Sequence, residues 1–288
     1  NWQQQILSEW HRVAGEGVKF SRAFCAAPSC SPARAGMLTG QDIWRLEEAA
    51  NLWGTFPQEC AVYTDLLRNA GYSVGYEGKG WGPGSLEDSG RESDPSGKEY
   101  ESFESFLDVN DDSKPWAFWF GSTDPHRPYD AGSGLASGMD MEKVSVPAYL
   151  PDCETVRSDI CDYYFEIERF DAEVGKIVGQ LESSGQLEDT IIVICADNGW
   201  QMPRGLANLY DSGVRVPLII SWPGQITGSR VVSDFVNLND LAPTFLELAG
   251  LDAPASMIGQ SLCKILFSGK SGRVEKERAD AVGLFDVD

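Results

Sequence analysis

The residues best suited to chemistry lie in segment 30–34, which reads Cys-Ser-Pro-Ala-Arg. Pro32 suits the first turn of a helix, where its missing N–H costs nothing, and Ser31 suits the cap in front of that helix. We therefore expect Cys30 at a helix N-terminus, where free N–H groups and the positive end of the helix dipole favour an anion. Arg34, one turn further on, adds a planar fork of donors for oxyanion oxygens. The alternative is that Cys30 is a small core residue beside a capped helix.

Four further polar residues follow short apolar segments of the chain: Lys79, His126, Asp197 and Asn198. Catalytic groups collect at the C-terminal ends of strands in α/β proteins, so this placement makes all four residues candidates. The alternatives stay open, because a lone lysine is usually a solvated surface charge, and a histidine in a turn can be satisfied by the backbone. The sequence Asp-Asn-Gly is also common in simple turns. The other histidine, His11, lies in an early helix-like stretch and is assigned no role.

The elements that must position these residues alternate between strands and helices. Short apolar segments bounded by Gly, Pro or Asp predict buried strands at 74–76, 116–120, 191–196 and 216–222. Helical patterns, each followed by a glycine, occur at 62–69, 154–184 and 240–249. This order predicts an α/β fold with a mixed, largely parallel central sheet and helices on both faces. Segments 80–100 and 131–140 are rich in small and acidic residues and are expected to be surface loops.

Composition limits the function. The 288 residues are 42% hydrophobic, enough for one large core, and no apolar run approaches the roughly 18 to 20 residues that cross a bilayer. The net charge of −21 argues against nucleic acid or an anionic membrane surface as a partner, and a site for an anion must build its own local positive potential. The seven cysteines form no CxxC pair, so they predict neither a disulfide framework nor a zinc finger.

Segment 30–40 has the pattern C-x-P-x-R followed by four residues and Thr-Gly, which resembles the signature of the sulfatase family. Segments 17–24 and 71–79 also resemble sulfatase sequences, and the likeness runs from about Leu7 to Phe267. The resemblance implies an alkaline-phosphatase-like fold with a catalytic domain over residues 1–268. It also implies that the family's first strand and most of its C-terminal subdomain are missing here. Residues 269–288 would be a charged tail or the start of that subdomain.

The same resemblance implies a role for each catalytic candidate. In sulfatases the signature cysteine, here Cys30, is oxidised to formylglycine, and one hydroxyl of its aldehyde hydrate attacks sulfur while the other allows the sulfated intermediate to collapse. Arg34 would orient this group, Lys79 would grip the sulfate oxygens, and His126 would protonate the leaving group. The implied cofactor is a divalent cation, calcium, and its implied ligands are Asp197, Asn198 and the converted Cys30.

The sequence departs from the family pattern in three places. Sulfatases supply two more metal-binding aspartates from the end of a first strand, which should precede Leu7 and is absent. A histidine often follows the lysine that corresponds to Lys79, whereas segment 80–83 reads Gly-Trp-Gly-Pro. The basic residue expected four positions before Tyr210 is Leu206, and Arg204, two positions away, is the candidate substitute for sulfate binding.

Segments 124–127, 162–171 and 207–210 resemble the sulfamidase (heparan N-sulfatase) branch. The expected function is hydrolysis of a sulfate ester or sulfamate on a small sulfated sugar or oligosaccharide, such as N-sulfoglucosamine. The alternatives are a phosphoester or phosphonate hydrolase of the same superfamily, and a non-catalytic sulfatase-like fragment. The implied partner is a formylglycine-generating or anaerobic maturation enzyme. The family's usual location is periplasmic, secreted or lysosomal, although residues 1–5 contain no signal-peptide pattern.

Overall fold

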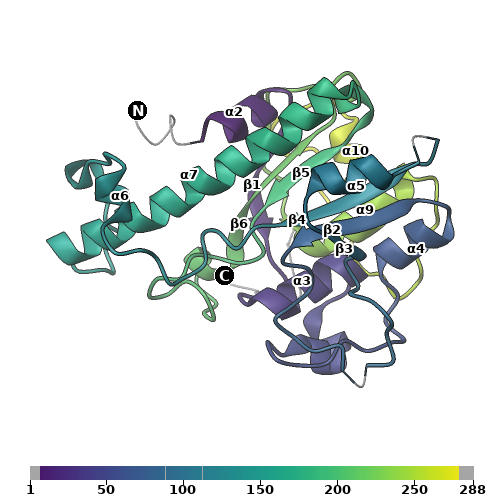
Figure 1. The fold of residues 1–288 in the computed structure, drawn as a ribbon, viewed down its shortest axis with the longest axis horizontal. Helices are drawn as coiled ribbons and strands as arrows, with labels where there is room; N and C mark the ends of the chain where they lie inside the picture. Colours follow the sequence, from purple (N-terminus) through teal and green to yellow (C-terminus); the bar gives the residue numbers. More distant parts are fainter. Residues whose placement is uncertain (1–6, 88, 112, 279–288) are drawn as a thin grey trace.

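Two β-sheets lie side by side at the centre of the molecule, and helices cover them (Figure 1). The structure is a computed structural model that describes residues 7–87, 89–111 and 113–278. The larger sheet has the strand order β5-β6-β1-β7, with β8 also paired to β1, and the smaller sheet has the order β3-β2-β4. The strands are β1 (Gly17–Phe24), β2 (Ser73–Gly78), β3 (Lys98–Tyr100), β4 (Trp116–Gly121), β5 (Ile192–Cys195), β6 (Arg215–Ser221), β7 (Arg230–Val232) and β8 (Val236–Asn237).

Most of the strand pairs are parallel. Strand β2 is parallel to β3 and β4, and β1 is parallel to β7 and β8, whereas β6 runs antiparallel to both β1 and β5. The predicted mixed, largely parallel α/β fold is therefore confirmed. The apolar segments predicted as strands coincide with β2, β4, β5 and β6.

The predicted helices are found as α4 (Tyr63–Asn69), α7 (Glu154–Ser183) and α9 (Leu241–Leu248). The other α-helices of the described residues are α2 (Ser8–Gly15), α3 (Cys30–Thr39), α5 (Phe103–Val109), α6 (Ser133–Ala136), α8 (Asp211–Val214) and α10 (Cys263–Leu266). Short 3-10 helices lie at η1 (Ile43–Arg45), η2 (Glu47–Ala50), η3 (Met141–Lys143), η4 (Leu187–Asp189) and η5 (Leu238–Asp240). None of the helices in the described ranges is long and apolar enough to span a membrane.

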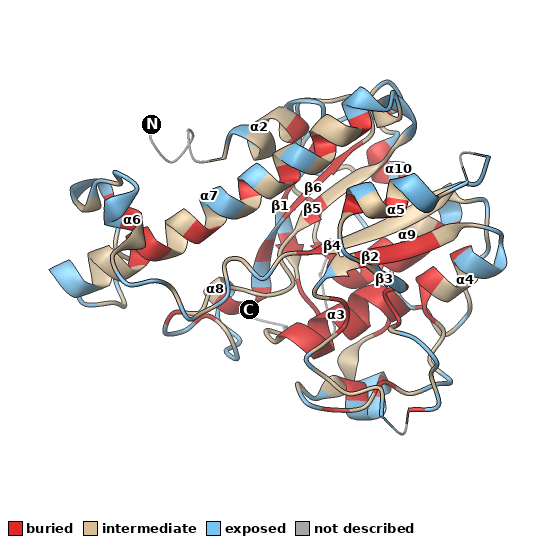
Figure 2. Ribbon diagram, in the orientation of Figure 1, coloured by how far each residue is buried: buried red, intermediate tan, exposed pale blue. Residues whose placement is uncertain are grey.

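The helices form a layer on each face of the sheets. Helices α3 and α9 pack apolar side chains against both sheets on one face, and α7 packs against both on the other face, together with α2 and α5. Figure 2 shows that α3 is buried along its whole length. Because α3 carries the cysteine motif, this burial fixes the motif against the centre of the fold.

Two segments expected to be surface loops contain short regular elements. Strand β3 lies in segment 80–100, and α6 lies in segment 131–140. Strand β3 is a three-residue edge strand with mostly exposed side chains, so it lacks the apolar pattern of a buried strand. In α6, Gly134 lies so close to the backbone of Cys161 on α7 that a Cβ atom would clash at 2.3 Å. Packing against α7 therefore fixes α6. Glycine has a low helix propensity, so the sequence did not predict a helix here.

The facing edges of the two sheets are the strands β4 and β5, and we call the line between them the β4–β5 seam. Each of these strands ends its sheet in the described part of the chain, so β4 pairs only with β2 and β5 pairs only with β6. Side chains of β4 and β5 nevertheless pack against the same hydrophobic clusters, Trp119 and Val193 against one and Phe118 and Ile192 against another. The two facing strand edges therefore lie in an apolar environment.

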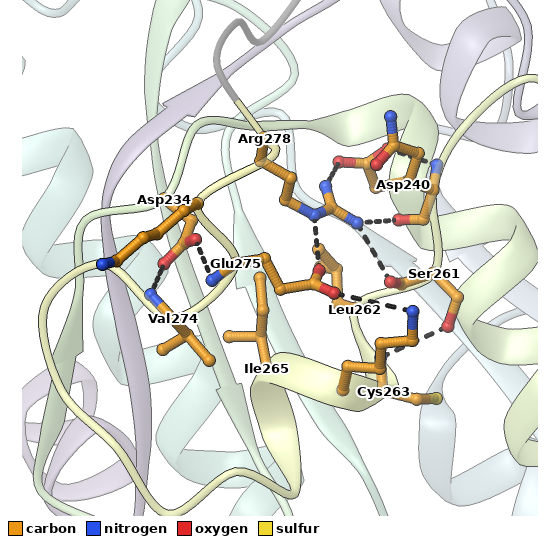
Figure 3. A network of polar contacts seen from close by, with 12 residues as sticks. Asp234, Asp240, Ser261, Leu262, Cys263, Ile265, Val274, Glu275 and Arg278 are labelled. Atoms are coloured by element: carbon orange, nitrogen blue, oxygen red, sulfur yellow. Dashed lines mark hydrogen bonds and ion pairs between the residues drawn. The ribbon is translucent and has the colours of Figure 1, made fainter.

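A buried polar network fastens the segment after α10 to the domain (Figure 3). Arg278 donates from Nη1 to Oδ2 of Asp240 at 2.8 Å, and only 5% of each residue is exposed. Asp234, which is also buried, accepts from the backbone N–H groups of residues 274–275 at 2.7 Å each. The described part of the expected charged tail is thus packed on the domain, and residues 279–288 lie outside the described residues.

Candidate active site

Helix α3 begins at Cys30, as predicted, and places the thiol at its N-terminus. The cap is Ser29, whose backbone is extended, so the prediction that Ser31 caps the helix is wrong. Ser31 lies inside the first turn, where its hydroxyl donates to the carbonyl oxygen of Leu52 at 2.8 Å and accepts from the N–H of Gly84 at 3.1 Å. These bonds attach two neighbouring loops to the start of the helix.

Arg34 connects α3 to the C-terminal ends of β2 and β5. Its Nε donates to Oδ2 of Asp197 at 2.7 Å. Its Nη1 donates to the carbonyl oxygens of Lys79 and Gly80, also at 2.7 Å each. The guanidinium also lies 5.9 Å from the ring centroid of Trp119 on β4. With 7% of its surface exposed, Arg34 acts mainly as a buried connector between the predicted site residues.

Asp197 and Asn198 follow β5 and face the cysteine. Oδ1 of Asp197 accepts from Nδ2 of Asn198 at 2.9 Å, and the same Nδ2 lies 3.6 Å from Sγ of Cys30. Burial alone would raise the pKa of Asp197, but the charges of Arg34 and Lys79 and a backbone hydrogen bond hold this pKa below its ordinary value. An ionised carboxylate therefore lies beside the thiol at neutral pH.

Two neighbouring thiols are unsuited to chemistry. Burial and the charge of Asp197 raise the pKa of both Cys25 and Cys195 to about 12. These two thiols therefore stay protonated at neutral pH, and the thiolate is the reactive form of cysteine. The motif residue Cys30, in contrast, lies at the N-terminus of a helix and lines the cavity described below.

Lys79 is placed by a tight approach between the ends of β2 and β4. Its backbone N–H donates to the carbonyl oxygen of Gly121 at 2.7 Å. The preceding residue, Gly78, has φ of +73°, and a Cβ atom there would lie 2.5 Å from the same carbonyl oxygen. Only glycine fits this position without strain. The side chain of Lys79 is half-buried and lines the same cavity as Cys30.

His126 lies on the loop that follows β4, with its ring exposed. Its Nδ1 is 2.6 Å from the carbonyl oxygen of Arg127, and its Nε2 is 3.3 Å from Nε2 of Gln201. The guanidinium of Arg127 makes a two-bond ion pair with Asp159 on α7 and donates from Nε to the carbonyl oxygen of Gln201 at 3.0 Å. Gln201 and Asp159, which no sequence pattern singled out, thus hold the histidine loop against the next strand end and α7.

Below this loop, two carboxyl groups share a buried position. Asp124 and Glu166 are hydrogen-bonded to each other, and their side chains are 7% and 6% exposed. Arg169 contacts Asp124 at 3.1 Å and Glu166 at 3.2 Å. Burial and the neighbouring Asp124 raise the pKa of Glu166 to about 7, so this carboxyl keeps a proton in weakly acidic solution.

The predicted catalytic residues converge on one cavity of about 1330 Å³. Its polar part is lined by Cys30, Arg34, Lys79, His126, Asp197 and Asn198. Its apolar part follows the β4–β5 seam and the facing side of α7. The arrangement provides a helix N-terminus, two cations, a carboxylate and an exposed imidazole around one space, which suits the binding and cleavage of a tetrahedral anion.

A family model described as Sulfatase matches residues 4–251. The chain belongs to the sulfatase family. N-sulphoglucosamine sulphohydrolase of Homo sapiens is 29% identical over an alignment 287 residues long, which includes 85% of this chain and 56% of the relative. Choline-sulfatase of Rhizobium meliloti is 25% identical, with 83% of this chain and 62% of the relative covered. The chain thus spans about half the length of the curated relatives it matches.

Solved structures show the same fold. A protein solved in complex with its substrate D-glucosamine-2-N,6-O-disulfate superimposes with a TM-score of 0.74 at 18% identity, over 94% of this chain and 76% of that one. A phosphonate monoester hydrolase from Silicibacter pomeroyi gives a TM-score of 0.76 at 19% identity, over 92% and 72% of the two chains. This chain therefore shares its fold with a protein whose substrate is a sulfated glucosamine and with a phosphonate monoester hydrolase.

Trp81 lies in segment 80–83, which follows Lys79 and lacks the histidine that sulfatases often have shortly after the lysine. Its indole N–H donates to the carbonyl oxygen of Ser31 at 3.0 Å, and its buried ring packs edge-on against Phe56 with centroids 5.1 Å apart. The residue therefore supports the start of α3 from behind. In this chain Trp81 makes a packing contact, and segment 80–83 contains no histidine that could make the expected polar contact.

The structure does not bring Arg204 to the cavity. Its exposed guanidinium lies over the rings of Tyr149 and Tyr210, 5.2 Å from each centroid, and the cavity is lined instead by Leu206. To contact a bound sulfate, Arg204 would have to leave both rings. The sulfatase position that normally carries a cation is thus apolar in the observed arrangement.

The donors for a cation are only partly present. Asp197 and Asn198 carry the carboxylate and amide oxygens that a hard divalent ion prefers. In the observed arrangement Asn198 turns its amide nitrogen, and not its oxygen, toward Asp197 and Cys30. Calcium takes six to eight oxygen ligands. Residues 7–87, 89–111 and 113–278 contain no group of three or more His, Cys, Asp or Glu that could hold a metal. The described residues therefore fit one side of the sulfatase cation site.

Proposed function

We propose that this protein hydrolyses a sulfate ester or sulfamate on a sulfated sugar, after Cys30 has been converted to formylglycine. The observation that carries this proposal is the convergence of Cys30, Arg34, Lys79, His126 and Asp197 around one cavity in a sulfatase-family chain. As formylglycine, residue 30 would supply the oxygen nucleophile that attacks sulfur. The substrate proposal rests on the relative named for N-sulphoglucosamine and on the structural neighbour solved with a glucosamine disulfate.

The side chains of this chain have distinct tasks in such a reaction. The N-terminus of α3 and the Lys79 ammonium bind the sulfate oxygens and offset their charge. Arg34 holds Asp197 and the backbone after β2 in place, so its role is positioning. His126 donates a proton from its ring to the departing nitrogen or oxygen, which allows the amine or alcohol to leave as a neutral product.

A calcium ion held by Asp197, Asn198 and the converted residue 30 would neutralise the sulfate charge when bound. The further aspartates that sulfatases use come from a first strand. The β4–β5 seam offers such a strand two unpaired edges that lead to Asp197 on one side and to the histidine loop on the other. Isothermal titration with calcium tests whether the residues of this chain bind the ion.

The production of an active enzyme would need a maturation partner. We propose a formylglycine-generating or anaerobic maturation enzyme that recognises the motif at residues 30–34 before α3 is buried, because all ten α3 residues are buried in the folded state. We also propose export to the periplasm, the outside of the cell or the lysosome, in keeping with a relative named as an extracellular sulfatase.

Co-expression with a formylglycine-generating enzyme tests the proposal. Mass spectrometry of the peptide that contains Cys30 reports conversion, and rates on glucosamine N-sulfate, an aryl sulfate and an aryl phosphate report the reaction. We expect conversion and faster turnover of the sulfates. Activity with an intact thiol would refute the formylglycine mechanism, and preference for the phosphate would favour the phosphohydrolase function of the structural neighbours. Full conversion without turnover would favour a non-catalytic protein, to which Leu206 also points.

A further inference from the structure

Trp53 is an exposed indole at the mouth of the catalytic cavity. With 76% of its surface exposed, it is the most open large hydrophobic side chain of the described residues. Single apolar side chains on a surface are common and need no explanation by themselves. Trp53, however, also lines the cavity that contains Cys30 and Lys79, together with its neighbours Leu52 and Pro83. An open aromatic face thus lies within the space that the substrate must enter.

The backbone on both sides of Trp53 is held in place. On one side, the carbonyl oxygen of Leu52 accepts the Ser31 hydroxyl at 2.8 Å, which ties the loop to the helix that starts at Cys30. On the other side, the carbonyl oxygen of Gly54 accepts from the N–H of Ser85 at 2.9 Å. A Cβ atom at Gly54 would lie 1.7 Å from the carbonyl oxygen of Glu48, so the loop is also closely packed there. The backbone that carries the indole is therefore fixed relative to the sulfate site before substrate binds.

The other groups near Cys30 can bind the sulfate but not the sugar ring that carries it. Lys79 and the start of α3 recognise the sulfate group but make no distinction between the molecules that carry it. A pyranose ring has an apolar C–H face, and an aromatic ring covers such a face while the sugar hydroxyls stay in water. Since Trp53 is rigidly carried and open to solvent, it suits that contact.

We propose that Trp53 is the stacking platform for the pyranose ring whose sulfate lies at Cys30, and that it selects sulfated sugars over other sulfated compounds. This inference rests on the proposed function for the position of the sulfate. Trp53 is accordingly a binding and specificity residue. Its contact with the pyranose ring contributes affinity in addition to that of the sulfate group.

Titration calorimetry on the full chain separates the sugar contact from the sulfate contact. The probes are glucosamine N-sulfate and inorganic sulfate. We expect Trp53→Ala to lower the affinity for glucosamine N-sulfate about tenfold and to leave the affinity for inorganic sulfate unchanged. Trp53→Phe should restore most of the lost affinity for the sugar. The matched control is Trp44→Ala, because Trp44 is 54% exposed but does not line the cavity. It should leave both affinities unchanged.

Each outcome decides between the inference and the proposed function. Equal sugar affinities for the wild type and Trp53→Ala would overturn the inference, as would an equal loss of affinity for sugar and inorganic sulfate. Failure of the wild type to bind the sugar would overturn it too. Binding of the sugar that depends on Trp53, without hydrolysis by converted protein, would support the inference and reject the proposed function.

Discussion

Replacing Glu166 by glutamine should remove a pH-dependent loss of stability from this domain. Glu166 lies on α7 and faces Asp124 of the histidine loop, with Arg169 contacting both carboxyls and the charge of Asp130 nearby. Its pKa is about 7 in the folded state against an ordinary value of 4.5. The folded state therefore binds this proton more tightly than the unfolded state. The resulting stabilisation is complete below pH 4.5 and is lost as the pH rises through 7.

The size of the effect follows from the gap between the two pKa values. A gap of about 2.5 corresponds to about 3 kcal/mol of unfolding free energy between pH 4.5 and pH 8. Little of this is screened by water, because only 6% of the Glu166 side chain is exposed. The charge of Arg169 favours the ionised form, and its effect is already contained in the pKa of about 7. Of the expected loss, about 2.5 kcal/mol falls between pH 5 and pH 8.

Urea unfolding at intervals from pH 5 to pH 8 measures this quantity. The wild type should lose about 2.5 kcal/mol more over this range than Glu166→Gln, whose amide has no proton to release. Glu168→Gln is the matched control, since Glu168 is exposed on the same helix, and it should follow the wild type. If Glu166→Gln and the wild type lose the same unfolding free energy over this pH range, the folded state does not bind the proton of Glu166 more tightly than the unfolded state, and the reasoning is refuted.

Three further substitutions test the connections around the site. Arg34→Met should lower the unfolding free energy by about 3 to 5 kcal/mol in urea titrations, because it leaves the Asp197 carboxylate and two carbonyl oxygens without their donor. Lys79→Met should lower the affinity for inorganic sulfate about ten- to a hundredfold in calorimetry, with little loss of stability. An unchanged affinity would show that Lys79 does not contribute to the sulfate site. Arg278→Met should cost about 3 to 5 kcal/mol by leaving Asp240 unpaired, and retained stability would show that the C-terminal network is dispensable.

The sequence was sufficient to predict the features that depend on a local pattern of residues. Apolar runs marked β2, β4, β5 and β6, and proline with its flanking residues marked the start of α3 at Cys30. Parallel strands end at the same edge of a sheet, so placing Lys79, His126 and Asp197 after strands was enough to predict that they meet. The observed cap, Ser29, lies two residues before the predicted one, Ser31, which is within the usual uncertainty of helix boundaries.

Features that depend on distant contacts were not predictable in this way. Gln201 touches His126 across 75 positions, and nothing in its neighbourhood of the sequence marks it. The pairing of Asp124 with Glu166 requires knowledge of which face α7 turns toward the histidine loop. Arg204 was chosen by its nearness in sequence to Leu206, whereas its conformation directs it to two tyrosine rings. In each case tertiary packing decides the partner.

The β4–β5 seam also affects how the isolated chain behaves in concentrated solution. A strand edge with free N–H and C=O groups is a template on which a strand of another molecule can pair. Along this seam two such edges run beside apolar side chains, so an added strand would be buried as in the middle of a parallel sheet. A strand of a second molecule could therefore pair along the seam in place of the first strand that sulfatases have.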